Sequence, residues 1–212
     1  MRLSLCAILL LLLFAGSSSA QSAPHEDTAP PKNEFAVLLG GSYFSTNVLA
    51  FSEDRKLVIT ELRYARQLTT RRRFSLKMTM DLVPAAILIE PKNVELTSRI
   101  IPGSPWRSVY GWGLTPVGLQ MNFRPRKRVQ PFAESTFGFL HFNSRVISPA
   151  ASRFNFTVDL GPGVQLFATP RQAVTLGYRY HHLSNADIAP RNPGADSNIF
   201  YVGYSFFWRH LR

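Results

Sequence analysis

Beyond Asn33, apolar and polar side chains alternate with a period of two residues, and helical spacing is not the dominant signal. From Phe74 to Leu82 the apolar residues occupy every second position, and the same holds from Val174 to Tyr180. Successive side chains of a β-strand point to opposite faces, so each segment has one apolar and one polar face. The pattern predicts strands at about 34–44, 56–68, 74–89, 108–123, 130–143, 153–168, 172–184 and 197–208.

The predicted connections alternate in length along the chain. Short connections cover 69–73, 124–129 and 169–171, whereas longer ones cover 46–55, 90–107, 144–152 and 185–196. Short turns at one end, long loops at the other and strands of this length are typical of outer-membrane barrels. The prediction is an all-β fold, an eight-stranded antiparallel transmembrane β-barrel over 34–212. A soluble β-sandwich or lipocalin-like barrel has the same period of two, but its apolar face points inward.

The N-terminus predicts export. Arg2 provides a positive charge, the run from Leu3 to Ala15 is almost wholly apolar, and small residues up to Ala20 offer a cleavage site. This predicts a signal peptide at 1–20, then a disordered leader at 21–33 that is rich in Pro, Ser, Ala and charge. The apolar run is too short to favour a retained membrane helix. Cys6 is the only cysteine and lies in this run, so disulfides, thiol catalysis and zinc–thiolate sites are excluded.

The charge of the chain favours an anionic partner. There are 24 Lys and Arg residues against 13 Asp and Glu, a formal net charge of +11. Such an excess suits nucleic acid or a phosphorylated lipid surface, although it also occurs on proteins whose charges are simply solvated. Export argues against nucleic acid, so the predicted partner is the lipid surface of the outer membrane. The oligomeric state stays open, a homodimer included.

One short window contains candidate catalytic residues. His182 and Ser184 are two apart on one predicted strand, so they share a face, and an imidazole nitrogen could reach the serine hydroxyl. Asp196, on the next predicted strand, could fix the imidazole tautomer from behind. His182 and Ser184 continue the row of alternate apolar residues that runs from Val174 to Tyr180, which predicts that they face lipid at the outer end of the barrel. The spacing alone is explained equally well if His182 and Ser184 are ordinary polar residues at the membrane interface, with no catalytic role.

The window His182-x-Ser184-Asn185-Ala186, on the penultimate predicted strand, resembles the lipid A 3-O-deacylase (PagL) family. The resemblance implies an outer-membrane serine esterase that hydrolyses the acyl chain at position 3 of lipid A. Carried over by position, His182 would be the general base and Ser184 the nucleophile. Asn185 would help to bind the oxyanion, and Asp196, fourteen residues after the histidine, would be the acid.

Two residues depart from the family pattern: Asp196 stands where the family has glutamate, and Asp187 where it has glycine. The resemblance implies lipid A or lipopolysaccharide as substrate and no metal or organic cofactor. A non-catalytic structural or adhesive outer-membrane barrel is the main alternative function, and a soluble periplasmic lipid carrier is a third.

Overall fold

The computed structural model describes residues 31–52 and 54–209, so the predicted signal peptide and most of the predicted leader lie outside the described residues. Within these ranges no helix has the length and hydropathy needed to cross a membrane. The chain forms β1 (Asn33–Ser42), β2 (Ser45–Thr46), β3 (Lys56–Thr70), β4 (Phe74–Pro91), β5 (Trp106–Phe123), β6 (Val129–Phe142), β7 (Phe154–Thr169), β8 (Gln172–Ser184) and β9 (Ala195–Trp208).

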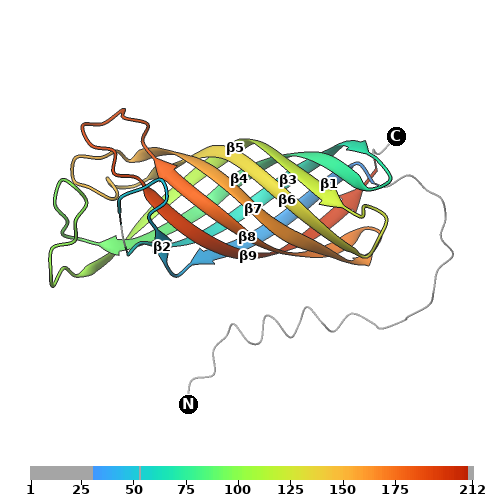
Figure 1. Ribbon diagram of the computed structural model, residues 1–212, viewed down its shortest axis with the longest axis horizontal. Coiled ribbons are helices and arrows are strands. Elements are labelled where there is room, and N and C mark those ends of the chain that lie inside the picture. Colours follow the sequence, from blue (N-terminus) through green and yellow to red (C-terminus); the bar gives the residue numbers. More distant parts are fainter. Residues whose placement is uncertain (1–30, 53, 210–212) are drawn as a thin grey trace, which may run out of the picture.

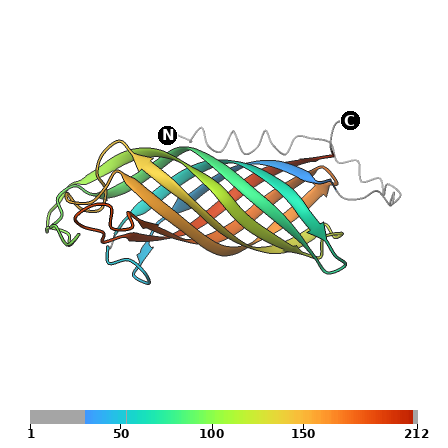
Figure 2. The ribbon, with the colours of Figure 1, turned by 90° about the horizontal axis from the view of Figure 1, so that it is seen from above.

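The eight long strands form a closed antiparallel barrel (Figure 1). Each long strand pairs with the next, and β9 returns to pair with β1 from Asn33↔Trp208 to Gly41↔Phe200. Closure leaves no unpaired sheet edge, which a strand structure needs in a bilayer because lipid offers no hydrogen bonds. The longer connections gather at one end of the barrel and the tight turns at the other (Figure 2). The predicted eight-stranded barrel is confirmed.

The predicted strand ends agree with the structure to within two residues, with two differences that matter. Asn33 belongs to β1 and not to the leader. The two-residue strand β2 was not predicted, because a period of two cannot be recognised over two positions. It pairs with the start of β9 through Ser45↔Ser197 and Thr46↔Asp196.

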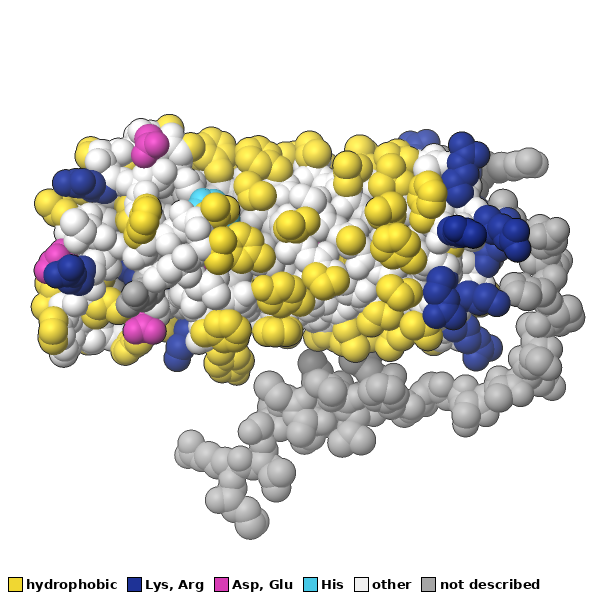
Figure 3. Space-filling view, viewed as in Figure 1, with side chains coloured by type: hydrophobic (Ala, Val, Ile, Leu, Met, Phe, Trp, Pro, Cys, Tyr) yellow, Lys and Arg dark blue, Asp and Glu magenta, His cyan; other side chains and the backbone are white. Residues whose placement is uncertain are grey.

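The outer wall of the barrel is apolar. Leu39, Val117, Leu160 and Phe200 each expose half or more of their surface, and Figure 3 shows apolar side chains along the length of the barrel on the face in view. Lysines and arginines crowd the end that carries the tight turns (Figure 3). An apolar wall that faces outward requires lipid around it. The soluble barrel, with its apolar face inside, is therefore the wrong alternative.

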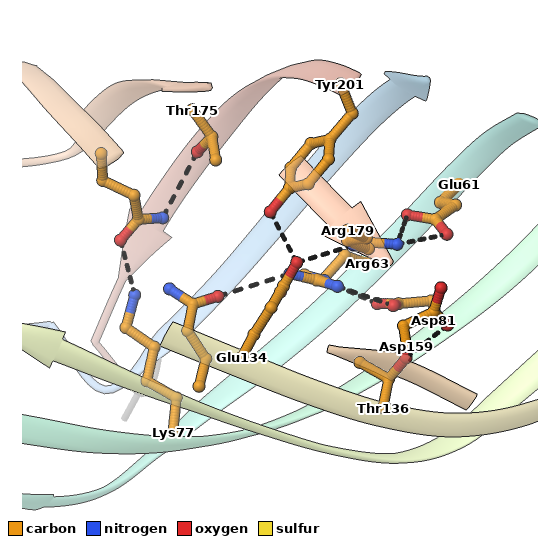
Figure 4. Close-up of polar contacts among 12 residues, drawn as sticks. Glu61, Arg63, Lys77, Asp81, Glu134, Thr136, Asp159, Thr175, Arg179 and Tyr201 are labelled. Carbon is orange, nitrogen blue, oxygen red and sulfur yellow. Dashed lines mark hydrogen bonds and ion pairs between the residues drawn. The ribbon is translucent and has the colours of Figure 1, made fainter. Parts of the chain in front are cut away.

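The middle of the barrel interior is filled by buried ion pairs (Figure 4). Arg63 contacts Asp81 and Glu134, each at 2.7 Å. Arg179 contacts Glu134 at 2.6 Å and Glu61 at 2.7 Å. Buried charges are tolerated when each has a partner at hydrogen-bonding distance, as here.

Nearer the long loops the interior contains a large apolar cluster beside the buried Arg55 and Glu90. This buried cluster includes Leu57, Leu88 and Phe142, and it extends to Leu183 on β8 and Ala195 on β9. The ends of β8 and β9 are thus packed against a core on their inner side. Side chains that project outward from these ends are carried by a well-supported backbone.

Candidate active site

Strands β8 and β9 bring His182 and Asp196 directly opposite each other in the antiparallel register. The Nδ1 atom of His182 lies 2.7 Å from Oδ1 of Asp196. The aspartate side chain is fully buried, whereas that of His182 keeps 18% of its surface exposed. The shorter carboxylate therefore reaches the ring because the two residues are cross-strand neighbours, whose Cβ atoms are about 4.5–5.5 Å apart.

A loop from the other end of the sequence holds the second oxygen of Asp196. The backbone N–H groups of Val48, Leu49 and Ala50 donate to Oδ2 at 2.9, 2.8 and 3.0 Å. Hydrogen bonds from several N–H groups favour the charged form of a carboxylate and fix its position. Strand β2 brings the loop to this place, since Thr46 pairs with Asp196.

The same loop is tied to the segment before β9 and presents apolar side chains outward. The N–H of Phe51 donates to the carbonyl of Pro193 at 2.9 Å, and the Ser52 hydroxyl donates to the carbonyl of Gly194. Val48, Leu49 and Phe51 are 70%, 62% and 82% exposed. An apolar surface therefore lies beside the His182–Asp196 pair, on the segment that holds the aspartate.

Ser184 ends β8, half-buried like His182, on the outward-facing parity that the sequence predicted. Its Oγ accepts hydrogen bonds from the Ala186 N–H at 3.1 Å and from Nδ2 of Asn192 at 3.2 Å. With both acceptor positions of the hydroxyl engaged, its own proton remains available for donation. No hydrogen bond joins Ser184 to His182 among the described residues; catalytic contacts of this kind often tighten only when substrate binds.

The orientation of the Asn192 amide follows from its two contacts. Its Oδ1 accepts from the backbone N–H of Asn185 at 2.9 Å, so its Nδ2 must be the group that faces Ser184. Sequence reasoning missed Asn192, which lies in an irregular loop with no periodic pattern. It also missed the backbone donors at Val48, Leu49 and Ala50, which no side-chain pattern could reveal.

Asn185 is placed differently from its sequence-based role. Its side chain is buried, and its Nδ2 donates to the carbonyl of Arg191 at 2.8 Å. Its amide therefore braces the loop that carries Asn192. The next two residues, Ala186 and Asp187, have φ angles of 50° and 60°, in the left-handed region. A glycine, which the family has at position 187, adopts this conformation at no steric cost.

Within the described part of the chain, no group of three or more His, Cys, Asp or Glu residues is arranged to hold a metal ion. The chemistry available at this place is that of a serine, an imidazole and a buried carboxylate, with hydrogen-bond donors around the serine. Such a set is suited to acyl transfer.

Comparison with known proteins identifies the family of the chain. A family model described as lipid A 3-O-deacylase (PagL) matches residues 92–205, which is more than half of the chain. The chain belongs to the lipid A 3-O-deacylase (PagL) family. The matched span contains His182, Ser184, Asn192 and Asp196 but not the loop at Val48–Ala50. In this PagL-family protein, the support of the aspartate thus comes from outside the matched region.

The crystal structure of the outer membrane enzyme PagL has the same fold. The two structures have a TM-score of 0.55 at 14% sequence identity, over 80% of this chain and 97% of that one. Neisserial surface protein A is less similar, with a TM-score of 0.46 at 10% identity over 82% of this chain and 97% of that one. No curated protein matches the sequence. The PagL-family chain is a protein of the bacterial outer membrane.

Proposed function

We propose that this protein is a serine esterase that removes the ester-linked acyl chain at position 3 of lipid A in the outer leaflet. Membership of the lipid A 3-O-deacylase family supports the reaction. The observation that carries the mechanism is the 2.7 Å contact between His182 and the buried Asp196. Ser184 lies two residues after His182 on the same outward face of β8.

In the first step Ser184 Oγ attacks the ester carbonyl carbon while Nε2 of His182 takes the hydroxyl proton. An unassisted serine is a weak nucleophile at neutral pH, so this transfer is essential. Asp196 accepts the Nδ1–H of His182, which leaves Nε2 free to act as a base, and it stabilises the imidazolium that forms.

The carbonyl oxygen becomes negatively charged in the tetrahedral intermediate. The Ala186 N–H and Asn192 Nδ2 already converge on Ser184 Oγ, so both donors lie next to the place where this charge develops. When Oγ attacks, the two donors must turn from Oγ to the carbonyl oxygen beside it, and because they are already held close by, this reorganisation is small. We assign the oxyanion role to these two groups, since the Asn185 amide is engaged with Arg191.

The intermediate collapses when the bond between the carbonyl carbon and the sugar oxygen breaks. His182 returns its proton to that oxygen, and the acyl group remains on Ser184 as an ester. Water then gives a proton to His182 while its oxygen attacks the acyl carbonyl. Ser184 leaves with the proton from His182, and the fatty acid is released.

The location of the site suits a substrate that stays in the membrane. Ser184 and His182 lie where the apolar wall meets the long loops, and Val48, Leu49 and Phe51 extend an apolar surface beside them. Acyl chains of lipid A could contact this surface while the ester lies at the level of the serine.

The proposal is tested by incubating the purified, refolded protein with lipopolysaccharide and measuring lipid A masses. We expect the wild type to remove one hydroxyacyl group, and Ser184→Ala to reduce the rate by on the order of 10^4 or more. Ser144→Ala, which changes a half-buried serine of the β6–β7 loop, is the matched control and should keep full activity. An unchanged lipid A mass with folded wild type would favour a structural or adhesive barrel.

A further inference from the structure

One glycine interrupts the row of apolar side chains on the outward face of β1. Phe35, Val37 and Leu39 project outward, and Tyr43, just beyond the strand, continues the row. Gly41 occupies the position between Leu39 and Tyr43. The wall of the barrel therefore lacks one side chain close to the end that carries the long loops.

The fold does not require glycine at this position. The described glycines with left-handed backbone are Gly103 and Gly194, so Gly41 is not one of them. A Cβ atom at Gly41 would meet a single neighbour, the Leu57 carbonyl oxygen, at an ordinary 3.8 Å. At every other described strand glycine, such an atom would come within 2.8 Å of a neighbour. A strand glycine often marks a bulge, a bend, or the close approach of another backbone or a ligand. The β1–β3 register is unbroken at Gly41, and the nearest backbone atom is the Leu57 carbonyl oxygen, so a ligand is the alternative that remains.

The missing side chain opens a groove of about 400 Å³ on the lipid-facing surface. Gly41 lines it together with the apolar residues Leu39, Val58 and Ile89. Lys56 also lines it, from the end of β3 nearest the long loops. Its Nζ lies 5.4 Å from the centre of the Trp106 ring, and among the described residues no carboxylate pairs with it.

We propose that this groove binds an acyl chain of a lipid A molecule whose phosphate pairs with Lys56. The groove offers an apolar slot within the wall and a positive charge at the headgroup level, which together match a phosphorylated, acylated lipid. It opens on β1, β3 and β4, whereas Ser184 lies on β8 beyond β9. The groove is lined by none of the candidate catalytic residues, so binding there can be measured without hydrolysis.

The test measures lipid binding in a Ser184→Ala background, so that turnover cannot obscure it and a failure of the proposed esterase activity does not affect it. Refolded protein in detergent is titrated with bisphosphorylated lipid A, and bound lipid is counted by native mass spectrometry. We expect Gly41→Leu, which fills the slot, to weaken the binding of one lipid A by about tenfold. Lys56→Gln should weaken it by about fivefold.

Two matched variants serve as controls. Val37→Leu adds bulk to the same face of β1 outside the groove, and Arg66→Gln removes an exposed charge from the opposite end of β3. Both should bind lipid A like the parent. The proposal is overturned if Gly41→Leu and Lys56→Gln, with the gel mobility of a folded barrel, also bind like the parent. Equally tight binding of phosphate-free lipid A or of phosphatidylglycerol would overturn it too.

Discussion

Two neighbouring histidines of β8 make the same contact on opposite sides of the barrel wall. The Nδ1 atom of His182 lies 2.7 Å from Asp196, and that of His181 lies 2.7 Å from Asp159. The His181 side chain is buried in the interior, where its Nε2 has no hydrogen-bond partner within 31–52 and 54–209. His182 is partly exposed on the outer face that also carries Ser184. A carboxylate partner alone does not make a histidine a catalytic base; a nucleophile and access for substrate must accompany it.

The two aspartates are also held by different parts of the molecule. The second oxygen of Asp159 accepts from the hydroxyl of Thr136 at 2.9 Å, so its support comes from the barrel itself. The second oxygen of Asp196 accepts from the backbone of Val48, Leu49 and Ala50 in a loop. The inner pair therefore belongs to the scaffold, whereas the outer pair is completed by a segment outside it.

The largest expected difference in deacylation rate between the His182–Asp196 and His181–Asp159 pairs comes from replacing each histidine. His182→Gln should lower deacylation by on the order of 10^4 or more, because the serine loses its base. His181→Gln should leave the rate within a few-fold. Its expected effect is on stability, since it removes one of the two hydrogen bonds of the buried Asp159, which typically costs about 1–3 kcal/mol. Lipid A mass analysis gives the first value and urea unfolding of the refolded barrel gives the second. Equal losses of activity in both variants would contradict the distinction.

The next largest difference is expected from neutralising each aspartate. Asp196→Asn should lower the rate by about 10^3- to 10^4-fold, because an amide favours the wrong imidazole tautomer and does not stabilise the imidazolium. Asp159→Asn should change the rate much less. Steady-state rates on purified lipopolysaccharide, with heat-modified gel mobility as a check on folding, compare the two. A rate for Asp196→Asn close to wild type would remove the aspartate from the mechanism.

A smaller loss is expected at the two loop asparagines, and it distinguishes their roles. Asn192→Ala removes a donor that points at Ser184, so kcat should fall by about 10^2- to 10^3-fold with little change in KM. Asn185→Ala removes only the brace to Arg191, and we expect a loss of about tenfold or less from a displaced loop. A larger loss for Asn185→Ala than for Asn192→Ala would return the oxyanion role to Asn185.

The alternation of apolar and polar residues along the strands predicts much of the fold but less of the candidate active site. A period of two over long strands fixed the barrel and placed His182 and Ser184 on its outer face, because alternation continues to the end of β8. The direct pairing of His182 with Asp196 depends on the β8–β9 register, which the loop between the strands leaves undetermined in the sequence.

The remaining parts of the site come from irregular segments. Ser184 ends β8, so strand alternation does not govern Asn185 or Asn192, and their contacts depend on the path of the loop. The donors to Asp196 are backbone groups more than 140 residues away along the chain. A backbone N–H is present at every residue except proline, so its use at one place leaves no mark in the sequence.

The anchoring of Asp196 has a consequence for when, during its transport to the outer membrane, the protein becomes active. Three of its hydrogen bonds come from the loop between β1 and β3, and this loop lies beside β9 where β1 and β9 pair to close the barrel. A newly exported, unclosed chain therefore lacks the assembled acid. We expect the esterase to be inactive in the periplasm and to become active only when the barrel has closed in the outer membrane.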